Sequence, residues 1–111
     1  MTKVYIPNVP MRRDPATGEW HPSMGLHAAE RFGELKILFS QTEVMSGAAP
    51  CEAVIGPRMH GIAEEDCVLF VGDPAIMALV IRTHSRLLPG AKLHLLKWDR
   101  FARDYLKVTL K

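Results

Sequence analysis

The sequence predicts one α/β domain over residues 1–111, with a mixed, mainly parallel sheet of four to five strands. Segment 67–98 has the pattern strand, helix, strand within about 30 residues, which is a βαβ unit with two parallel strands. Segment 92–110 contains two strand patterns joined by a short loop, which predicts a C-terminal antiparallel hairpin. With 48% hydrophobic and 23% charged residues, the chain is typical of a globular protein that needs neither disulfides nor metal to fold.

The N-terminal third predicts a strand, a hairpin and a helical turn. The strand is Val4–Ile6, and the prolines at Pro7 and Pro10 assign it to an edge of the sheet, because proline lacks the amide that a central strand uses. Within 12–20, an Asp-Pro pair followed by glycine favours a turn, so we expect a small hairpin or an ordered surface loop there. His27–Phe32 predicts a short helical turn, because a glycine follows it in the usual capping position.

The middle of the chain predicts a strand, a loop and a short helix. Glu34–Ser40 is mostly apolar, which is typical of a strand buried on both faces. Gln41–Ala49 is polar and small and predicts a loop. Pro50 suits the first position of a helix over Cys51–Ile55, which Gly56-Pro57 should stop or kink.

The βαβ unit has the clearest boundaries in the chain. Cys67–Val71 predicts a buried strand, and Ala75–Leu88 predicts the helix that follows it. Asp73 is suited to cap this helix, because its carboxylate can accept hydrogen bonds from the free amides of the first turn. Pro74 is suited to the first helical position, because proline has no amide hydrogen to leave unsatisfied there. Lys92–Trp98 predicts the second strand, parallel to the first.

Alternation in the C-terminal hairpin predicts which of its side chains face the core. Successive strand residues point to opposite faces, and in Tyr105–Leu110 every second residue is apolar. The residues expected to face the core are Leu93, Leu95, Leu106, Val108 and Leu110. The residues expected on the outer face are Lys92, His94, Trp98, Tyr105 and Lys107.

The net charge of +2 conceals an uneven distribution. Residues 92–111 carry six basic and two acidic side chains, a net charge of +4, whereas residues 30–73 carry three basic and eight acidic ones, a net charge of −5. Clustered basic charge is the first sign of nucleic-acid binding, and charge asymmetry also governs association with protein partners.

The sequence contains no catalytic constellation and no metal-ligand spacing. Its histidines do not follow H-x-x-x-H or H-E-x-x-H patterns, and Cys51 and Cys67 are not spaced like a zinc knuckle. We therefore predict no catalytic residue, no metal site and no cofactor. The longest apolar stretch, Ala75–Ile81, is much shorter than the ~20 residues of a membrane span, so we expect a cytoplasmic protein that does not contact membranes.

The turn Gly72-Asp73-Pro74 offers an alternative function. Helix N-termini that follow parallel strands attract anions, so this turn could serve a small nucleotide-binding enzyme. The chain lacks the glycine-rich phosphate motifs, however, and a capping Asp with a proline at the first helical position explains the same residues.

The strongest functional pattern combines aromatic and basic residues near the C-terminus. Single-stranded nucleic acid is bound by aromatic rings that stack on bases and by Lys and Arg that neutralise phosphates. The residue types of segment 97–107 fit both roles, and the loop at 12–20 adds a second group of the same character. The predicted nucleic-acid-binding residues are Arg12, Arg13, Trp20, Lys97, Trp98, Arg100, Phe101, Arg103, Tyr105 and Lys107.

Several short segments along the chain resemble those of small uncharacterised proteins of tailed bacteriophages. These segments are Val-Tyr-Ile-Pro-Asn, Asp-Pro-Ala-Thr-Gly-Glu-Trp, Phe-Gly-Glu-Leu, Val-Gly-Asp-Pro-Ala and Leu-Leu-Lys-Trp-Asp-Arg. They are turns and strand ends, so the resemblance implies no residue roles. It implies an accessory protein acting in the cytoplasm of an infected bacterium, where such proteins bind DNA, a polymerase or a host defence component.

Together these observations predict a non-enzymatic phage protein that binds single-stranded DNA, in support of transcription or replication. The first alternative is an inhibitor that binds a host protein, either a polymerase or a defence component. The second is the nucleotide-binding enzyme that would use the Gly72 turn. An exposed strand edge would also allow a homodimer.

Overall fold

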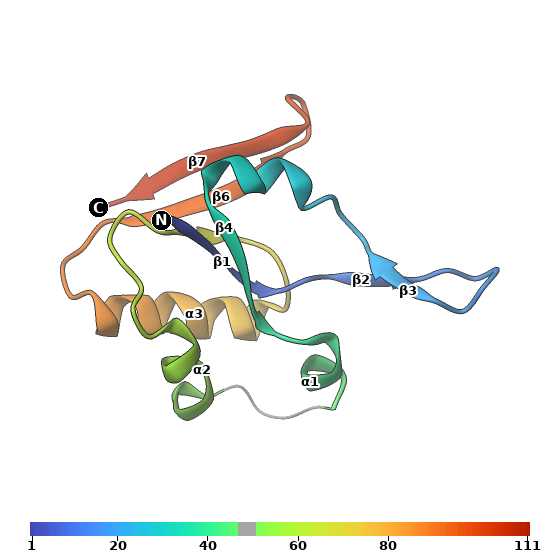
Figure 1. Cartoon of the computed structure of the whole chain (residues 1–111), viewed down its shortest axis with the longest axis horizontal. Helices are drawn as coiled ribbons and strands as arrows, with labels where there is room; N and C mark the ends of the chain where they lie inside the picture. The colour runs from blue at the N-terminus through green and yellow to red at the C-terminus, as the bar shows by residue number, and fades with distance from the viewer. Residues whose placement is uncertain (47–50) are drawn as a thin grey trace.

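A computed structural model describes residues 1–46 and 51–111 and confirms the predicted fold class. Five strands form one sheet in the order β4-β1-β5-β6-β7, with the first four parallel and β7 antiparallel to β6 (Figure 1). The strands are β1 (Lys3–Asn8), β4 (Glu34–Phe39), β5 (Cys67–Leu69), β6 (Leu93–Asp99) and β7 (Asp104–Leu110). The predicted βαβ unit and the C-terminal hairpin are therefore both present.

Helices cover both faces of the sheet. On one face, α2 (Glu52–Met59) and α3 (Pro74–Leu87) pack on a core that includes Tyr5 and Val68. On the other face, the 3₁₀-helix η1 (His27–Phe32) packs on a second core that includes Val4 and Leu69. The alternation of Val4 and Tyr5 between these two cores is the period of two that a strand imposes on its side chains. The sheet therefore has no fully solvated face at its centre.

The predicted edge position of β1 and the predicted burial of β4 on both faces are wrong. β1 is a central strand, and β4 is the edge strand beside it, with Ile37 exposed. Within β1, only Val4 and Tyr5 pair with β5. Pro7 therefore lies beyond the part of β1 that has a neighbouring strand on both sides. The missing amide of Pro7 is tolerated for that reason, although proline in a strand usually indicates an edge.

Two predictions about the middle of the chain hold only in part. The expected loop over 41–49 contains the helix α1 (Gln41–Met45). The predicted short helix is present as α2, but it continues through Gly56 and Pro57 instead of stopping there. Ile55 and Met59 of α2 are fully buried against the sheet. Their burial favours a continuous helix, although an internal proline removes one backbone hydrogen bond. The prediction for Pro50 lies outside the described residues.

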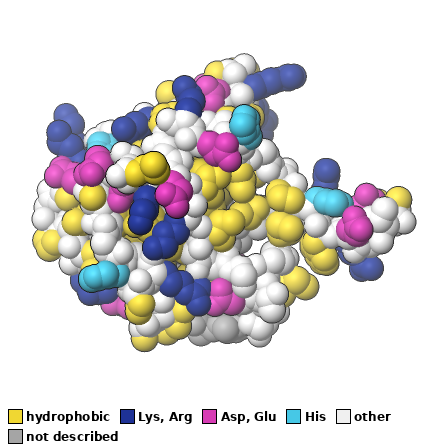
Figure 2. Space-filling model, viewed as in Figure 1, with side chains coloured by type: hydrophobic (Ala, Val, Ile, Leu, Met, Phe, Trp, Pro, Cys, Tyr) yellow, Lys and Arg dark blue, Asp and Glu magenta, His cyan; other side chains and the backbone are white. Residues whose placement is uncertain are grey.

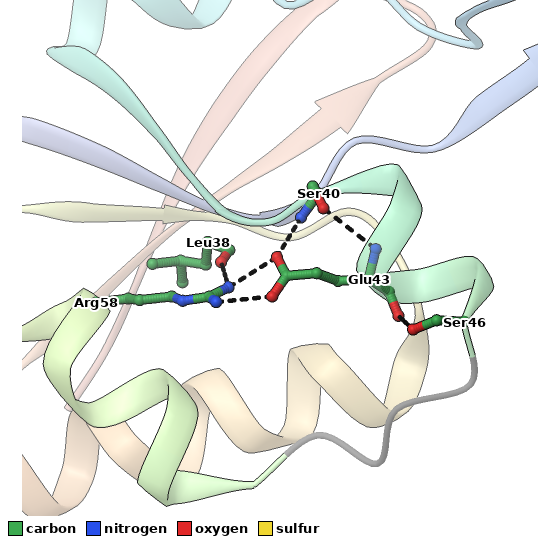
Figure 3. A network of polar contacts seen from close by, with 5 residues as sticks. All are labelled: Leu38, Ser40, Glu43, Ser46 and Arg58. Carbon is green, nitrogen blue, oxygen red and sulfur yellow. Dashed lines mark hydrogen bonds and ion pairs between the residues drawn. The ribbon is translucent and has the colours of Figure 1, made fainter.

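A polar network joins α1 to β4 and α2 (Figure 3). The Ser40 hydroxyl accepts from the Glu43 amide, and the Glu43 carboxylate accepts from the Ser40 amide, which forms a capping box. Both carboxylate oxygens of Glu43 also accept from Arg58, at 2.9 and 2.7 Å, and Arg58 donates to the carbonyl of Leu38 at 2.6 Å. The hydrogen bonds from Arg58, together with the Ser40 amide, lower the pKa of Glu43 to about 2. The ionised carboxylate of Glu43 therefore connects α1 to Arg58 of α2.

The predicted hairpin near the N-terminus is confirmed and projects from the body of the molecule (Figure 1). It consists of β2 (Met11–Arg13) and β3 (Trp20–Pro22), which form a separate two-stranded antiparallel sheet. Gly18, with a φ of 76°, closes its turn by donating its amide to the Asp14 carbonyl at 2.7 Å. We call residues 11–22 the arm.

No helix among the described residues has the length and apolarity needed to cross a bilayer.

Candidate functional site

The arm and the turn between β6 and β7 project from the same end of the sheet (Figure 1). The arm follows the carboxyl end of β1, and the turn follows the carboxyl end of β6, which is parallel to β1 through β5. Ligands of open α/β sheets bind at this end, because the connecting loops converge there. We call residues 97–107 the tip. The fold thus brings the two predicted groups of site residues to one end of the molecule.

The structure corrects the predicted exposure of Tyr105. Trp98 is 44% exposed, as predicted, but Tyr105 directly opposite it in the ladder is only 3% exposed. The predicted outer face of the hairpin is the face on which η1 packs, so Tyr105 lies in the second core with Leu96 and Ala29. Tyr105 therefore does not offer a ring to a ligand.

The expected burial of the opposite face of the hairpin is wrong at β7. Leu93 is buried as predicted, but Leu106 and Leu110 are about half exposed. The helix α3 packs over β1 at the centre of the sheet, and β7 is the edge strand. The alternation therefore assigned the faces correctly, but the helices do not cover the apolar face as far as its edge.

Tyr105 positions other parts of the site. Its ring meets the Trp98 ring in an edge-to-face arrangement, with centroids 5.1 Å apart and an interplanar angle of 72°. Its hydroxyl donates to the carbonyl of Gly25 at 2.9 Å. Burial raises the pKa of this phenol, so the hydroxyl remains a neutral donor. Tyr105 thus connects the tip to the segment that returns from the arm.

The arginines of the chain fall into two groups. Arg31, Arg58, Arg82 and Arg86 all form ion pairs with carboxylates, at 2.7 to 3.3 Å. Within the described part of the chain, no carboxylate pairs with the four arginines of the arm and the tip. These are Arg12, Arg13, Arg100 and Arg103, and all four are exposed. The arginines that have no ion pair within the described residues therefore lie at one end of the molecule, although Arg82 and Arg86 share the single carboxylate of Glu52.

Two lysines of the tip, Lys97 and Lys107, are also exposed, and within the described residues neither forms an ion pair. The acidic groups beside them are engaged in local contacts. Asp99 accepts from the amides of Phe101 and Ala102, and Asp104 pairs with Arg31 at 2.8 Å. Figure 2 shows Lys and Arg side chains over the β6–β7 turn at the top of the view, and on both sides of the arm.

Exposed aromatic rings gather at the same end. Phe101 is 95% exposed at the turn, and Trp20 is about half exposed on the arm. Sequence reasoning missed Phe70, which is also about half exposed and follows the carboxyl end of β5. Its place in the apolar run Cys67–Val71 suggested a buried strand, whereas β5 ends at Leu69. The exposed ring of Phe70 was therefore not predicted.

Two pockets adjoin Trp98. One, of about 240 Å³, is lined by Ser23, Met24, Gly25 and Trp98. The other, of about 390 Å³, is a shallow hollow of the tip lined by Lys97, Trp98, Asp99, Arg100, Phe101 and Leu106. A larger groove, of about 580 Å³, lies between α2 and α3, and there Arg86 forms an ion pair with Glu52 at 3.3 Å. The hollow of the tip combines the Trp98 and Phe101 rings with the exposed cations Lys97 and Arg100.

The Gly72 turn has a structural explanation. The Asp73 carboxylate accepts from the amides of Ala75 and Ile76, at 2.9 and 3.3 Å, so the first free amides of α3 are already bonded. The Asp73 amide donates to the side chain of Asn8 at 2.8 Å. Gly72 has a φ of 112°, and a Cβ there would lie 2.2 Å from the same Asn8 oxygen. Glycine is therefore needed for the close approach of Asn8.

A family model described as Phage Pam3 gp32-like protein matches residues 2–111, and this match confirms the resemblance to phage proteins. No curated protein and no solved structure matches the chain.

Proposed function

We propose that this chain, which belongs to the Phage Pam3 gp32-like protein family, is an accessory protein that binds single-stranded DNA through the arm and the tip. The observation that carries the proposal is the division of the arginines. Those on the arm and the tip, such as Arg12 and Arg100, are exposed and unpaired within the described residues, whereas each of those elsewhere forms an ion pair with a carboxylate. An unneutralised basic surface favours a polyanion, because phosphate contacts release condensed counterions.

The exposed rings favour a single strand over a duplex. Unpaired bases stack on aromatic side chains with about 1–3 kcal/mol per base, whereas the bases of a duplex are already stacked on each other. Trp98 and Phe101 on the tip, Trp20 on the arm and Phe70 between them are available for such stacking. The buried Tyr105 supports Trp98 and does not itself stack on a base. In this proposal the protein acts in the cytoplasm of the infected cell.

A salt-titrated binding assay tests this function. Labelled single-stranded and duplex oligonucleotides of equal length are mixed with the protein, and binding is followed by fluorescence anisotropy. The proposal predicts binding of the single strand at micromolar protein, with an affinity that falls steeply as salt rises. Absence of binding, or an affinity that does not change with salt, would argue against it.

A protein partner is the second candidate, and the exposure of β7 favours it. Leu106 and Leu110 lie about half exposed on one face of this edge strand, where an added strand or a second copy of the chain could cover them. A host polymerase or a defence component would be such a partner. The variant Leu110→Gln, which lies outside the tip and changes no charge, would then weaken retention of one host protein in a pull-down, or a dimer in size-exclusion chromatography, while leaving oligonucleotide binding intact.

A further inference from the structure

The pocket of about 240 Å³ beside Trp98 is formed by two segments that are far apart in the sequence. Trp98 comes from β6, and Ser23, Met24 and Gly25 come from the segment between the arm and η1. Ser23 is fixed to the base of the arm, because its amide and its hydroxyl both donate to the Pro10 carbonyl, at 2.8 and 3.0 Å. The pocket therefore lies where the arm, η1 and the tip meet.

Tyr105 holds both sides of this pocket. Its ring supports Trp98 edge to face, and its hydroxyl holds the Gly25 carbonyl. Because Tyr105 is itself buried in the second core, the two walls are fixed relative to each other before any ligand arrives. A preformed site loses less conformational entropy on binding than one that must be ordered.

Gly25 lines the pocket, and the fold does not require a glycine at this position. Its φ lies outside the left-handed region that favours glycine, unlike that of Gly72. A Cβ on Gly25 would meet no atom within 4 Å. The backbone would thus accept a side chain at this position, where Gly25 is one of the four residues that line the pocket.

We propose that this pocket takes one unpaired nucleobase, which stacks on the Trp98 indole next to Met24. The proposal rests on the proposed function and adds to it the element that selects single strands. A base can enter the pocket only after leaving its own stack, which is easier in a single strand than in a duplex. Lys107 shares a face of the hairpin with Trp98, and Arg100 and Arg103 lie in the adjoining turn, so phosphates on either side of the base have cations within the tip.

The test fills the pocket and follows a base by its fluorescence. The variant Gly25→Leu adds a leucine side chain to the lining of the pocket, and Ala53→Leu places the same side chain at an exposed position of α2 as a control. The probe is a single-stranded oligothymidylate with one 2-aminopurine, whose fluorescence is quenched when the base stacks. Thermal unfolding of both variants checks that each is folded.

The wild type and Ala53→Leu should quench 2-aminopurine and bind the single strand at least tenfold more tightly than a duplex. Gly25→Leu should lose the quenching and most of this preference, while keeping salt-dependent binding. If the wild type binds the oligonucleotide and Gly25→Leu quenches it equally well, the pocket proposal is overturned and the proposed function remains. If the wild type binds no oligonucleotide at all, both are overturned.

Discussion

The rings of Trp98 and Tyr105 lie opposite each other on neighbouring strands, 5.1 Å apart and nearly perpendicular, with one exposed and the other buried. This pair joins the core to the exposed end of the molecule. Edge-to-face contacts contribute about 0.5–1.5 kcal/mol beyond the area they bury, so Tyr105 restricts the indole as well as supporting it. The role of Tyr105 in the site is therefore to position Trp98.

Removing only the hydroxyl of Tyr105 separates its two contacts. Tyr105→Phe keeps the ring that supports Trp98 but loses the hydrogen bond to Gly25. We expect the free energy of unfolding to fall by about 1 kcal/mol, the usual net value of one hydrogen bond, as measured by urea denaturation. Tyr105→Ala should cost about 3–5 kcal/mol, because it also empties part of the core. Equal losses for the two variants would show that the ring contributes nothing.

Trp98→Ala should affect binding more than folding. Trp98 is 44% exposed, so its removal exposes less core than the loss of Tyr105. We expect single-stranded DNA to bind about tenfold more weakly, which corresponds to the loss of one stacked base at about 1–3 kcal/mol. Anisotropy titration measures the Kd, and tryptophan quenching on binding should diminish in parallel. An unchanged Kd would remove Trp98 from the interface.

Gly72→Ala should destabilise the fold through its contact with Asn8. The added Cβ would lie 2.2 Å from the Asn8 side-chain oxygen, at a φ of 112° that residues with a side chain rarely adopt. Backbone strain of this kind costs about 1–3 kcal/mol, and the steric conflict adds to it. Gly90→Ala is the matched control, because its φ is also positive but a Cβ there meets nothing within 4 Å. Thermal unfolding should show a clearly larger fall in the unfolding temperature for Gly72→Ala than for Gly90→Ala. Equal falls would mean that the Asn8 side chain moves away at no cost.

His84 should make the stability depend on pH near neutrality. It is buried in α3, and no described residue is a hydrogen-bond partner of its Nε2. Burial, helped by the charge of His94, lowers the pKa of His84 from the ordinary value of 6.5. Below pH 6.5 the unfolded chain then binds a proton that the folded chain does not. The free energy of unfolding therefore falls as the pH is lowered from 6.5 towards the folded pKa, and it is fully retained above 6.5.

His84→Leu removes this proton and should flatten the dependence. Urea denaturation between pH 5 and pH 7.5 compares the two proteins, and the difference in their free energies of unfolding should change only on the acidic side of 6.5. A wild-type stability that stays constant relative to His84→Leu across this range would contradict the lowered pKa.

The sequence predicted the elements whose boundaries depend on neighbouring residues. Asp73 and Pro74 placed the start of α3, because capping depends on neighbouring residues alone. The same kind of signal was present at Ser40 and Glu43, whose spacing is that of a capping box and could have identified α1. The place of β1 in the sheet could not be predicted from neighbouring residues. Pro7 indicates only that one backbone amide is missing, and it does not show which strands pair with β1.

The candidate site shows the same division between local and long-range information. Alternation placed Trp98 and Tyr105 on one face of the hairpin, which is correct, but it could not show that η1 covers part of that face. Nor could composition show which arginines meet a carboxylate, because Arg31 and Asp104 are 73 residues apart. These contacts arise from tertiary packing, and they decide which charges and rings remain available.

The most direct measurement compares two pairs of arginines in a salt titration with single-stranded DNA. Arg100→Ala/Arg103→Ala removes exposed arginines of the tip, and Arg82→Ala/Arg86→Ala removes the same charge from α3, where both pair with Glu52. The tip variant should bind more weakly, and its slope of log affinity against log salt should be smaller in magnitude by roughly 1.4, at about 0.7 per phosphate contact. The α3 variant should keep the wild-type slope. Equal effects of the two variants would mean that net charge alone is responsible and would contradict a DNA-binding surface at the tip.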